Sequence, residues 1–206
     1  MSEASDRLIA EELRQGLQGC RIGNEIVVVE ETGSTNDLAW QAAGRGAGEG
    51  FVVFAEHQTQ GRGQHGRRWQ STPYLGLTFS ILLRPALTLR ESPKLTSILA
   101  QGVASAVEEE SGQTTRIKPP NDIYLGDRKI AGLLVEGRTE ADGTYVAVAG
   151  IGINVNQTVD DFPEELRETA GSLLMATGKK ISRGKLAIAV LRRFAVVAQA
   201  SCLWGR

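Results

Sequence analysis

The chain of 206 residues lacks the features of several large protein classes. Its two cysteines, Cys20 and Cys202, have no metal-binding spacing and are too few for a disulfide scaffold. No apolar run approaches the roughly 20 residues of a membrane span, and the polar, acidic start is unlike a signal peptide. The net charge is only −1, so nothing global indicates nucleic acid as a partner. We therefore expect a cytoplasmic protein that binds neither nucleic acid nor membrane.

What the chain does contain is typical of a globular domain. Hydrophobic residues make up 41% and charged residues 23% of the sequence, both ordinary values for a folded protein. The length suits one domain of catalytic size with a small appendage. We expect an N-terminal segment over 1–25 that forms a short helix, a catalytic domain over 26–200 and a tail over 201–206.

The hydrophobic pattern predicts a sheet with helices packed on it. Close turns at Gly126-Asp127 and Asp142-Gly143 join neighbouring strands, which favours antiparallel or mixed pairing over βαβ winding. The expected strands cover 26–29, 51–55, 75–83, 115–117, 122–125, 130–137 and 145–155. The expected helices cover 6–18, 34–43, 92–110, 163–176 and 182–200. The predicted fold class is α/β in the α+β sense, with a mixed, largely antiparallel central sheet and flanking helices.

The most informative segment runs from Gly61 to Trp69. It places three glycines, three arginines and an aromatic residue within nine positions. Glycines let a backbone approach a ligand and expose its N–H groups, and guanidinium groups match the oxygens of phosphate and carboxylate. The segment therefore predicts a loop that binds an anion.

The same loop matches the G-x-G-x-x-G pattern of dinucleotide-binding folds, which must be tested first. That pattern needs a strand before the glycines, a helix after them and an acidic residue about 20 positions later. The apolar run 51–55 supplies the strand, but residues 67–73 have no helical period and end in a proline. Arg84 stands where the carboxylate is needed. We reject the dinucleotide interpretation and keep the anion-binding loop.

A second segment, from Lys118 to Gly132, combines two lysines with an amide and a carboxylate. Two consecutive prolines stiffen its start and fix the directions of Lys118, Asn121 and Asp122, while Lys129 lies near the start of the next strand. Such a group beside an arginine loop suits a nucleotide, with Asp122 available for a metal or an amine. A polar turn followed by a hairpin is an equally good interpretation of this segment taken alone.

Two shorter segments are weaker signals. Residues 150–156 place glycines inside an apolar strand, which often marks close approach by a ligand, and Asn154 stands where a core would prefer an aliphatic residue. A buried strand ending in a turn explains this pattern as well. Ser34, Thr35 and Asn36 suit the start of a helix, and their hydroxyl and amide groups would also hold a neutral polar head group.

Taken together, these segments resemble the biotin–protein ligase family. The segments that match in order and approximate spacing are Ser34–Asn36, Gln58–Trp69, Lys118–Gly132 and Gly150–Asn156. The resemblance implies the fold of class II aminoacyl-tRNA synthetases and biotin ligases. It also implies an ATP-dependent enzyme that joins biotin and ATP into biotinyl-AMP with Mg²⁺ present. The biotinyl group would then pass to a lysine of a biotin carboxyl carrier protein or domain.

The resemblance also implies roles for individual residues. Arg62, Lys118 and Lys129 would be catalytic cations, and Asp122 would orient or deprotonate the incoming lysine amine. The expected biotin contacts are Ser34, Thr35, Asn36, Gln58, Gly61, Arg62, Gly63, Gln64, Trp69, Lys129 and Gly132. The expected nucleotide contacts are Gln64, Arg67, Lys118, Asn121, Asp122 and Asn154. For the metal, the candidate ligands are Asp122 and the ATP phosphates.

The sequence departs from the family pattern in two residues and in length. Many members have arginine where this chain has Gln64, and tryptophan is usual where it has Pro119. Because Gln64 carries no charge, we expect weaker retention of the adenylate. We also expect neither the N-terminal winged-helix domain of the repressor-type members nor their β-rich C-terminal domain. The resemblance is compatible with a homodimer.

Two other functions remain open at this point. A lipoate or octanoate ligase or transferase would share the fold and the adenylate chemistry, although the glycine–arginine loop and the run from Lys118 to Asp122 resemble the biotin pattern. A biotin- or nucleotide-binding protein without turnover is the second alternative. The presence of Arg62 and Lys129 beside these residues argues against it.

Overall fold

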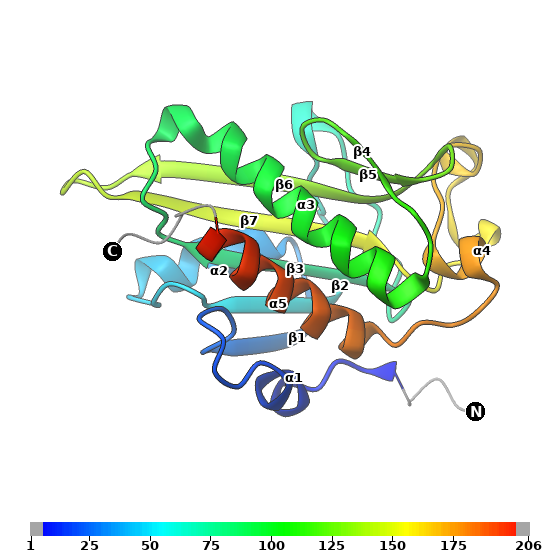
Figure 1. Cartoon of the computed structure of the whole chain (residues 1–206), viewed down its shortest axis with the longest axis horizontal. Coiled ribbons are helices and arrows are strands. Elements are labelled where there is room, and N and C mark those ends of the chain that lie inside the picture. Colours follow the sequence, from blue (N-terminus) through cyan, green and yellow to red (C-terminus); the bar gives the residue numbers. More distant parts are fainter. Residues whose placement is uncertain (1–5, 201–206) are drawn as a thin grey trace.

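A computed structural model describes residues 6–200 as one sheet covered by helices on both faces (Figure 1). The sheet has seven strands in the order β1-β2-β3-β7-β6-β5-β4. The first strand, β1 (Ile26–Thr32), runs parallel to β2 (Val52–Gln58), and all other neighbours are antiparallel. The remaining strands are β3 (Gly76–Leu83), β4 (Arg116–Lys118), β5 (Asp122–Leu125), β6 (Arg128–Thr139) and β7 (Tyr145–Asn154). The expected mixed, largely antiparallel sheet is confirmed.

Helices cover the two faces unequally. On one face, α3 (Ser92–Ser111) and α5 (Arg183–Ala200) lie side by side across the sheet, and the shorter α1 (Ala10–Gly16) packs next to α5 (Figure 1). The helix α2 (Thr35–Gly44) packs on the other face, against β2, β3 and β7, with a small core of its own. The three layers leave β6 and β7 partly uncovered beside α2, and the candidate site lies there.

The main core lies between the sheet and the α3–α5 layer. Every residue of β3 is buried, as its continuous apolar run predicts, and Phe54 stacks on Phe79 at 5.0 Å between ring centroids. The N-terminal segment contributes Leu8, Leu13 and Leu17 to this same core. Residues 8–17 therefore pack as part of the one core and not as a separate unit.

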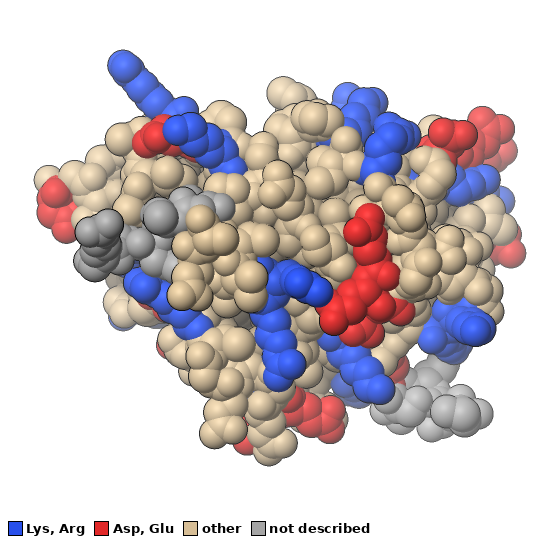
Figure 2. Space-filling view, viewed as in Figure 1, with Lys and Arg blue, Asp and Glu red and all other residues tan. Residues whose placement is uncertain are grey.

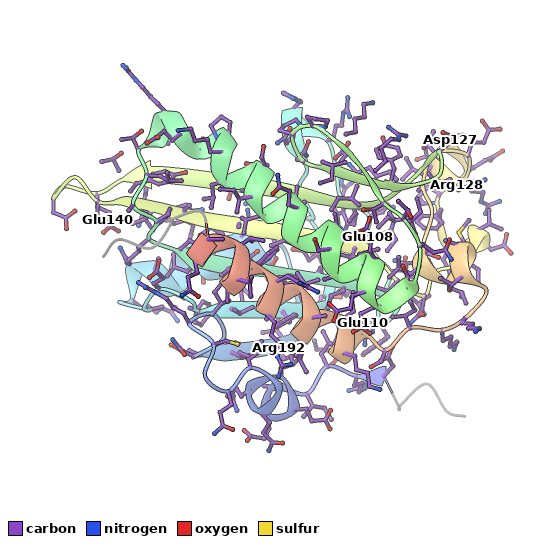
Figure 3. All side chains as sticks on the ribbon, viewed as in Figure 1. Glu108, Glu110, Asp127, Arg128, Glu140 and Arg192 are labelled. Carbon is purple, nitrogen blue, oxygen red and sulfur yellow. The ribbon has the colours of Figure 1, made fainter. Side chains whose placement is uncertain are left out.

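The outer face of α3 and α5 is charged. Figure 2 shows acidic and basic groups over these helices, and Figure 3 labels Glu108 and Glu110 near the end of α3 and Arg192 on α5. Arg193 reaches across from α5 to Glu109, with 2.8 Å between the guanidinium and carboxylate. Within residues 6–200, no helix is long and apolar enough to cross a membrane.

The structure corrects the helix expected over 163–176. That stretch contains a single 3₁₀ turn (Glu164–Leu166) and then α4 (Leu173–Thr177). Between them, residues 167–169 form a turn and Ala170 bridges to Lys129, whose backbone bonds on both sides of it, with Lys129 N to Thr169 O at 2.8 Å and Gly171 N to Lys129 O at 2.9 Å. Pairing with a distant strand therefore overrides the local helical pattern.

The first expected helix is also shorter than 6–18. Only residues 10–16 are helical, since Leu8 N donates to the buried carboxylate of Glu56 at 2.9 Å and so pulls the preceding residues onto the sheet. The same carboxylate binds Arg183, which is fully buried, at 2.6 Å. The expected tail over 201–206, with Cys202, lies outside the described residues.

Candidate functional site

A cavity of about 550 Å³ lies on the α2 side of the sheet, over β6 and β7. Fifteen of the sixteen predicted site residues line it: Ser34, Thr35, Asn36, Gln58, Arg62, Gly63, Gln64, Arg67, Trp69, Lys118, Asn121, Asp122, Lys129, Gly132 and Asn154. The exception is Gly61, which lies behind Trp69 and faces a second hollow on the outer side of the loop. The last two segments meet because β5, β6 and β7 are neighbours in the sheet. The first lies on α2, which packs against β7, and the loop after β2 places Trp69 over Gly132 and Gly152.

One end of the cavity is built from neutral polar groups. Ser34, Thr35 and Asn36 are buried at the start of α2, as their helix-starting chemistry predicts. Gln58, at the end of β2, uses its Oε1 to accept the backbone N–H of Thr35 at 2.7 Å, and the same oxygen lies 3.0 Å from the Thr35 hydroxyl. The other end of the Gln58 amide, Nε2, is therefore a hydrogen-bond donor. This arrangement suits a ligand with a neutral head group.

Ser80, on β3, extends this polar end and was not predicted from the sequence. Its hydroxyl lies 2.7 Å from Thr35 Oγ1 and 2.6 Å from Asn36 Oδ1, and the residue is fully buried. In the sequence it is one polar residue in an apolar strand, which is a weak signal. A buried hydroxyl must be satisfied by hydrogen bonds, and here the partners are residues of the predicted site.

Glu136, on β6, is a second residue that the sequence analysis missed. Its Oε2 accepts the side-chain amide of Asn36 at 2.9 Å and the indole N–H of Trp40 at 3.2 Å. The two-residue period of a strand places it on the same face as Gly132 and Leu134, both of which line the cavity. That period was the one signal available in the sequence.

Arg62 is held by two carboxylates at this end of the cavity. Its guanidinium binds Asp37 in bidentate fashion, at 2.8 and 2.7 Å, and lies 3.4 Å from Glu136. The hydrogen bond from Arg62 lowers the pKa of Asp37, and the same contact raises the pKa of Arg62. The charge that was expected to serve the phosphates is therefore compensated in this structure.

The loop that carries Arg62 is a tight hairpin. Gly63 N donates to Arg67 O at 2.7 Å, and Trp69 N donates to Gly61 O at 2.9 Å. At the tip, His65 and Gly66 adopt left-handed conformations with φ of 58° and 73°, which a glycine takes without strain. The hairpin directs Trp69 inward, onto the sheet, while Arg67 and Arg68 stay exposed.

The glycines of the sheet make room for side chains of the protein itself. A methyl group on Gly152 would overlap the indole ring of Trp69, and one on Gly132 would lie 3.3 Å from it. A methyl group on Gly150 would overlap the amide of Asn36. In the sequence, these strand glycines indicate close approach by a ligand. The structure shows that they first admit Trp69 and Asn36, which then line the cavity.

The opposite end of the cavity is cationic. Lys118 ends β4 and lies across from Asp122 in the β4–β5 pairing, and Lys129 starts β6. Lys129 Nζ is 2.6 Å from Asp122 Oδ1 and 5.9 Å from the centre of the Trp69 ring. Within residues 6–200, Lys118 and Arg67 form no ion pair. Arg68 also lines the cavity without an ion pair, although it donates to Thr59 O, and these three are the described cations left to meet an anionic ligand.

A segment after β7 forms the wall beside these cations. Phe162, Leu166, Thr169 and Ala170 line the cavity, and nothing in their sequence marked them as site residues. The segment is fixed by the backbone of Lys129 and by Asn154, whose side chain donates to Gly171 O at 2.9 Å. Arg128, labelled in Figure 3 at the turn between β5 and β6, donates to Ala170 O at 3.0 Å.

The amide groups of Asn121 and Asn154 are both used within the protein. Asn121 donates to Leu133 O at 3.0 Å, which ties the turn after Lys118 to β6. In this structure both asparagines hold the walls of the cavity in place. Their predicted contacts with nucleotide stay a prediction, and so do the individual ligand contacts of the other site residues.

Known proteins are similar to this chain in sequence and in fold. Residues 28–156 match the family described as biotin/lipoate A/B protein ligases. The bifunctional ligase/repressor BirA of Bacillus subtilis is 40% identical over 177 residues, which are 86% of this chain and 54% of the relative. The biotin–[acetyl-CoA-carboxylase] ligase of Mycobacterium tuberculosis is 34% identical over 87% of this chain and 66% of its own length. The chain thus spans about half to two thirds of these relatives.

Solved structures give the same result for the fold. A biotin protein ligase from Aquifex aeolicus in complex with biotin and ATP superimposes with a TM-score of 0.73 at 31% identity, covering 87% of this chain and 72% of that one. The Leishmania major biotin protein ligase in complex with biotinyl-5-AMP gives 0.67 at 27% identity, over 85% and 76% of the two chains.

Proposed function

Because the chain belongs to the biotin/lipoate A/B protein ligase family, we propose that it is a biotin–protein ligase that works through an adenylate. The observation that carries this proposal is one cavity with two different ends. Neutral amide and hydroxyl groups of Thr35, Asn36 and Gln58 lie at one end, and Lys118 and Lys129 lie at the other. Biotin has the matching asymmetry, with a neutral ureido head and an anionic carboxylate tail.

In the first proposed step, a carboxylate oxygen of biotin attacks the α-phosphorus of ATP, and the bond to the departing pyrophosphate breaks. Negative charge gathers around the phosphates, so fixed cations lower the barrier. Lys118 and Arg67 supply positive charge and form no ion pair within residues 6–200. Lys129 lies between Trp69 and Asp122, where its ammonium group would meet the biotin carboxylate and the adenylate linkage.

We propose that Mg²⁺ enters on the triphosphate. Residues 6–200 contain no group of three His, Cys, Asp or Glu side chains that would hold a metal by themselves. Magnesium is commonly bound by substrate phosphates with only one or two carboxylates, and it would offset phosphate charge there. Asp122 is the carboxylate at this end of the cavity, and it is already bound to Lys129.

In the second proposed step, a lysine amine of the carrier attacks the acyl carbon, and AMP leaves with the electrons of the acyl–oxygen bond. The amine is protonated at neutral pH and must lose a proton first. Asp122 is our candidate to accept or orient that proton once Lys129 turns toward the adenylate. The names of relatives that act on acetyl-CoA carboxylase support a carboxylase carrier domain as the acceptor.

One assay separates this function from its alternatives. The purified chain is incubated with ATP and Mg²⁺ plus biotin, lipoate or octanoate, with and without a carrier domain, and pyrophosphate release and carrier mass are followed. We expect pyrophosphate with biotin alone and a carrier heavier by one biotinyl group when both are present. If product forms with lipoate or octanoate but not with biotin, that acid and not biotin is the substrate. Binding of biotin without pyrophosphate would indicate a binding protein.

A further inference from the structure

Glu136 connects three parts of the neutral end of the cavity, although no step of the proposed reaction uses it. Its carboxylate accepts hydrogen bonds from the side chains of Asn36 and Trp40 on α2, and it lies 3.4 Å from the Arg62 guanidinium in the loop. The side chain is 32% exposed, so its contacts and not burial define its environment. Arg138, two positions along β6, stacks on Trp40 at 4.5 Å from the ring centre.

The contact with Glu136 fixes which way the Asn36 amide points. A carboxylate only accepts hydrogen bonds, so the atom of Asn36 that faces it must be the NH₂ group. The oxygen then faces Ser80, whose hydroxyl lies at 2.6 Å. Asn36 is 3% exposed and lies directly over Gly150, so its amide is held between these two partners.

This orientation sets the direction of the next hydrogen bonds. Ser80 has one hydrogen, and Asn36 Oδ1 is able only to accept, so Ser80 donates to Asn36. Ser80 then accepts from the hydroxyl of Thr35, which lies 2.7 Å from Ser80 and at the longer distance of 3.0 Å from Gln58 Oε1, so its single hydrogen goes to Ser80. Gln58 Oε1 still accepts the Thr35 backbone N–H at 2.7 Å. The chain therefore runs from Thr35 through Ser80 and Asn36 to Glu136.

We propose that Glu136 is a positioning residue that fixes the donor and acceptor pattern of the head-group end. With the chain running in this direction, the Thr35 hydroxyl oxygen keeps a lone pair for a ligand N–H, and Gln58 Nε2 donates to a ligand carbonyl. A cyclic urea presents an N–H beside a carbonyl and matches that pattern. The inference rests on the proposed function, and it assigns selection of the ureido head to a residue that does not touch it.

The test replaces Glu136 with glutamine, which keeps the shape but is able to face Asn36 with either end of its amide. We expect the dissociation constant for biotin, measured by calorimetry, to rise about ten-fold, which is about 1.4 kcal/mol. The KM for ATP should stay within about two-fold, because the cationic end is untouched. The matched control is Glu109→Gln on α3, which removes an exposed carboxylate paired with Arg193 and should leave both values unchanged.

A second substitution distinguishes positioning from loss of stability. When Glu136→Gln is combined with Asn36→Asp, the new carboxylate at position 36 accepts from both Ser80 and the new amide at position 136, which restores the direction of the chain. We expect the double variant to bind biotin more tightly than either single variant, since Asn36→Asp alone places two carboxylates together. A general loss of folding would instead make the two losses add.

The outcomes separate the two proposals. Biotin binding by the unmodified chain with no rescue in the double variant would overturn the role of Glu136 alone. Equal rises in the dissociation constant for biotin and in the KM for ATP in Glu136→Gln would also overturn the role of Glu136. Thermal unfolding of each variant shows whether it is folded. No biotin binding by the unmodified chain would overturn both the ligase function and this inference.

Discussion

Replacing Gly152 with alanine should drive Trp69 off the floor of the cavity. A methyl group at this position overlaps the indole ring, and the cross-strand partner of Gly152 is Gly132, which supports the same ring from beside it. Gly152 lies within β7, where the backbone is held on both sides by β3 and β6. The ring therefore has to move, because the strand is unable to.

The size of the effect follows from the burial of Trp69. Full burial of a large apolar side chain is worth about 1.5–3 kcal/mol, and Trp69 is half-buried. Displacing the ring forfeits about 1 kcal/mol, which corresponds to about a five-fold rise in the biotin concentration needed for half-maximal rate. The free energy of unfolding should change by less than about 1 kcal/mol, since the loop of Trp69 is at the surface and β7 itself stays paired.

Biotin-dependent pyrophosphate release over a range of biotin concentrations measures the effect. The matched control is Gly184→Ala, a glycine in α5 where an added methyl group meets nothing within 4 Å. Trp69→Ala should produce a similar loss, and Gly152→Ala should add little to it because the clashing ring is gone. If Gly152→Ala behaves like the control, or if the two losses add in full, the packing of Trp69 on Gly152 does not support the site.

Three further results are expected. Lys129→Ala should reduce pyrophosphate release at least about a hundred-fold, as loss of a cation at developing phosphate charge does; unchanged turnover would mean that this lysine is misassigned. Arg62 lowers the pKa of Asp37 below 3.8, so the pair stabilises the fold above that pH and the effect is lost as pH falls through the lowered pKa. Melting curves between about pH 5 and 2 should therefore show a small acid-dependent loss that Asp37→Asn lacks, small because both side chains are partly exposed. Gln64→Arg adds a cation to the cavity wall and should slow release of biotinyl-AMP, measured by filtration; an unchanged release rate would show that Gln64 is not at the adenylate.

The sequence predicted the strands and most of the helices, because their hydrophobic patterns are long and regular. It failed at 163–176, where local residues favour a helix but Lys129 pairs with the backbone at Thr169 and Gly171. Single-sequence patterns contain no information about such a partner, which lies about 40 positions away in the chain.

For the site, the chemistry of single segments was readable, but the partners of their residues were not. The glycine–arginine loop predicted an anion site, which stays a prediction, whereas fifteen of the sixteen predicted residues do line one cavity. Arg62, however, is bound to Asp37 and Glu136, and the strand glycines lie under Trp69 and Asn36. Neither arrangement has a local signal.

The sequence by itself determined which groups this protein has available: an exposed basic loop, a rigid lysine–carboxylate segment and a polar helix start in a family-specific order. Only the tertiary structure decided how these groups are paired. Asn36 and Glu136 are 100 positions apart, yet they share a hydrogen bond because β6 and β7 place Glu136 beside α2. Side-chain charge and polarity are local properties, whereas hydrogen-bond partners depend on strand register and on which face is buried.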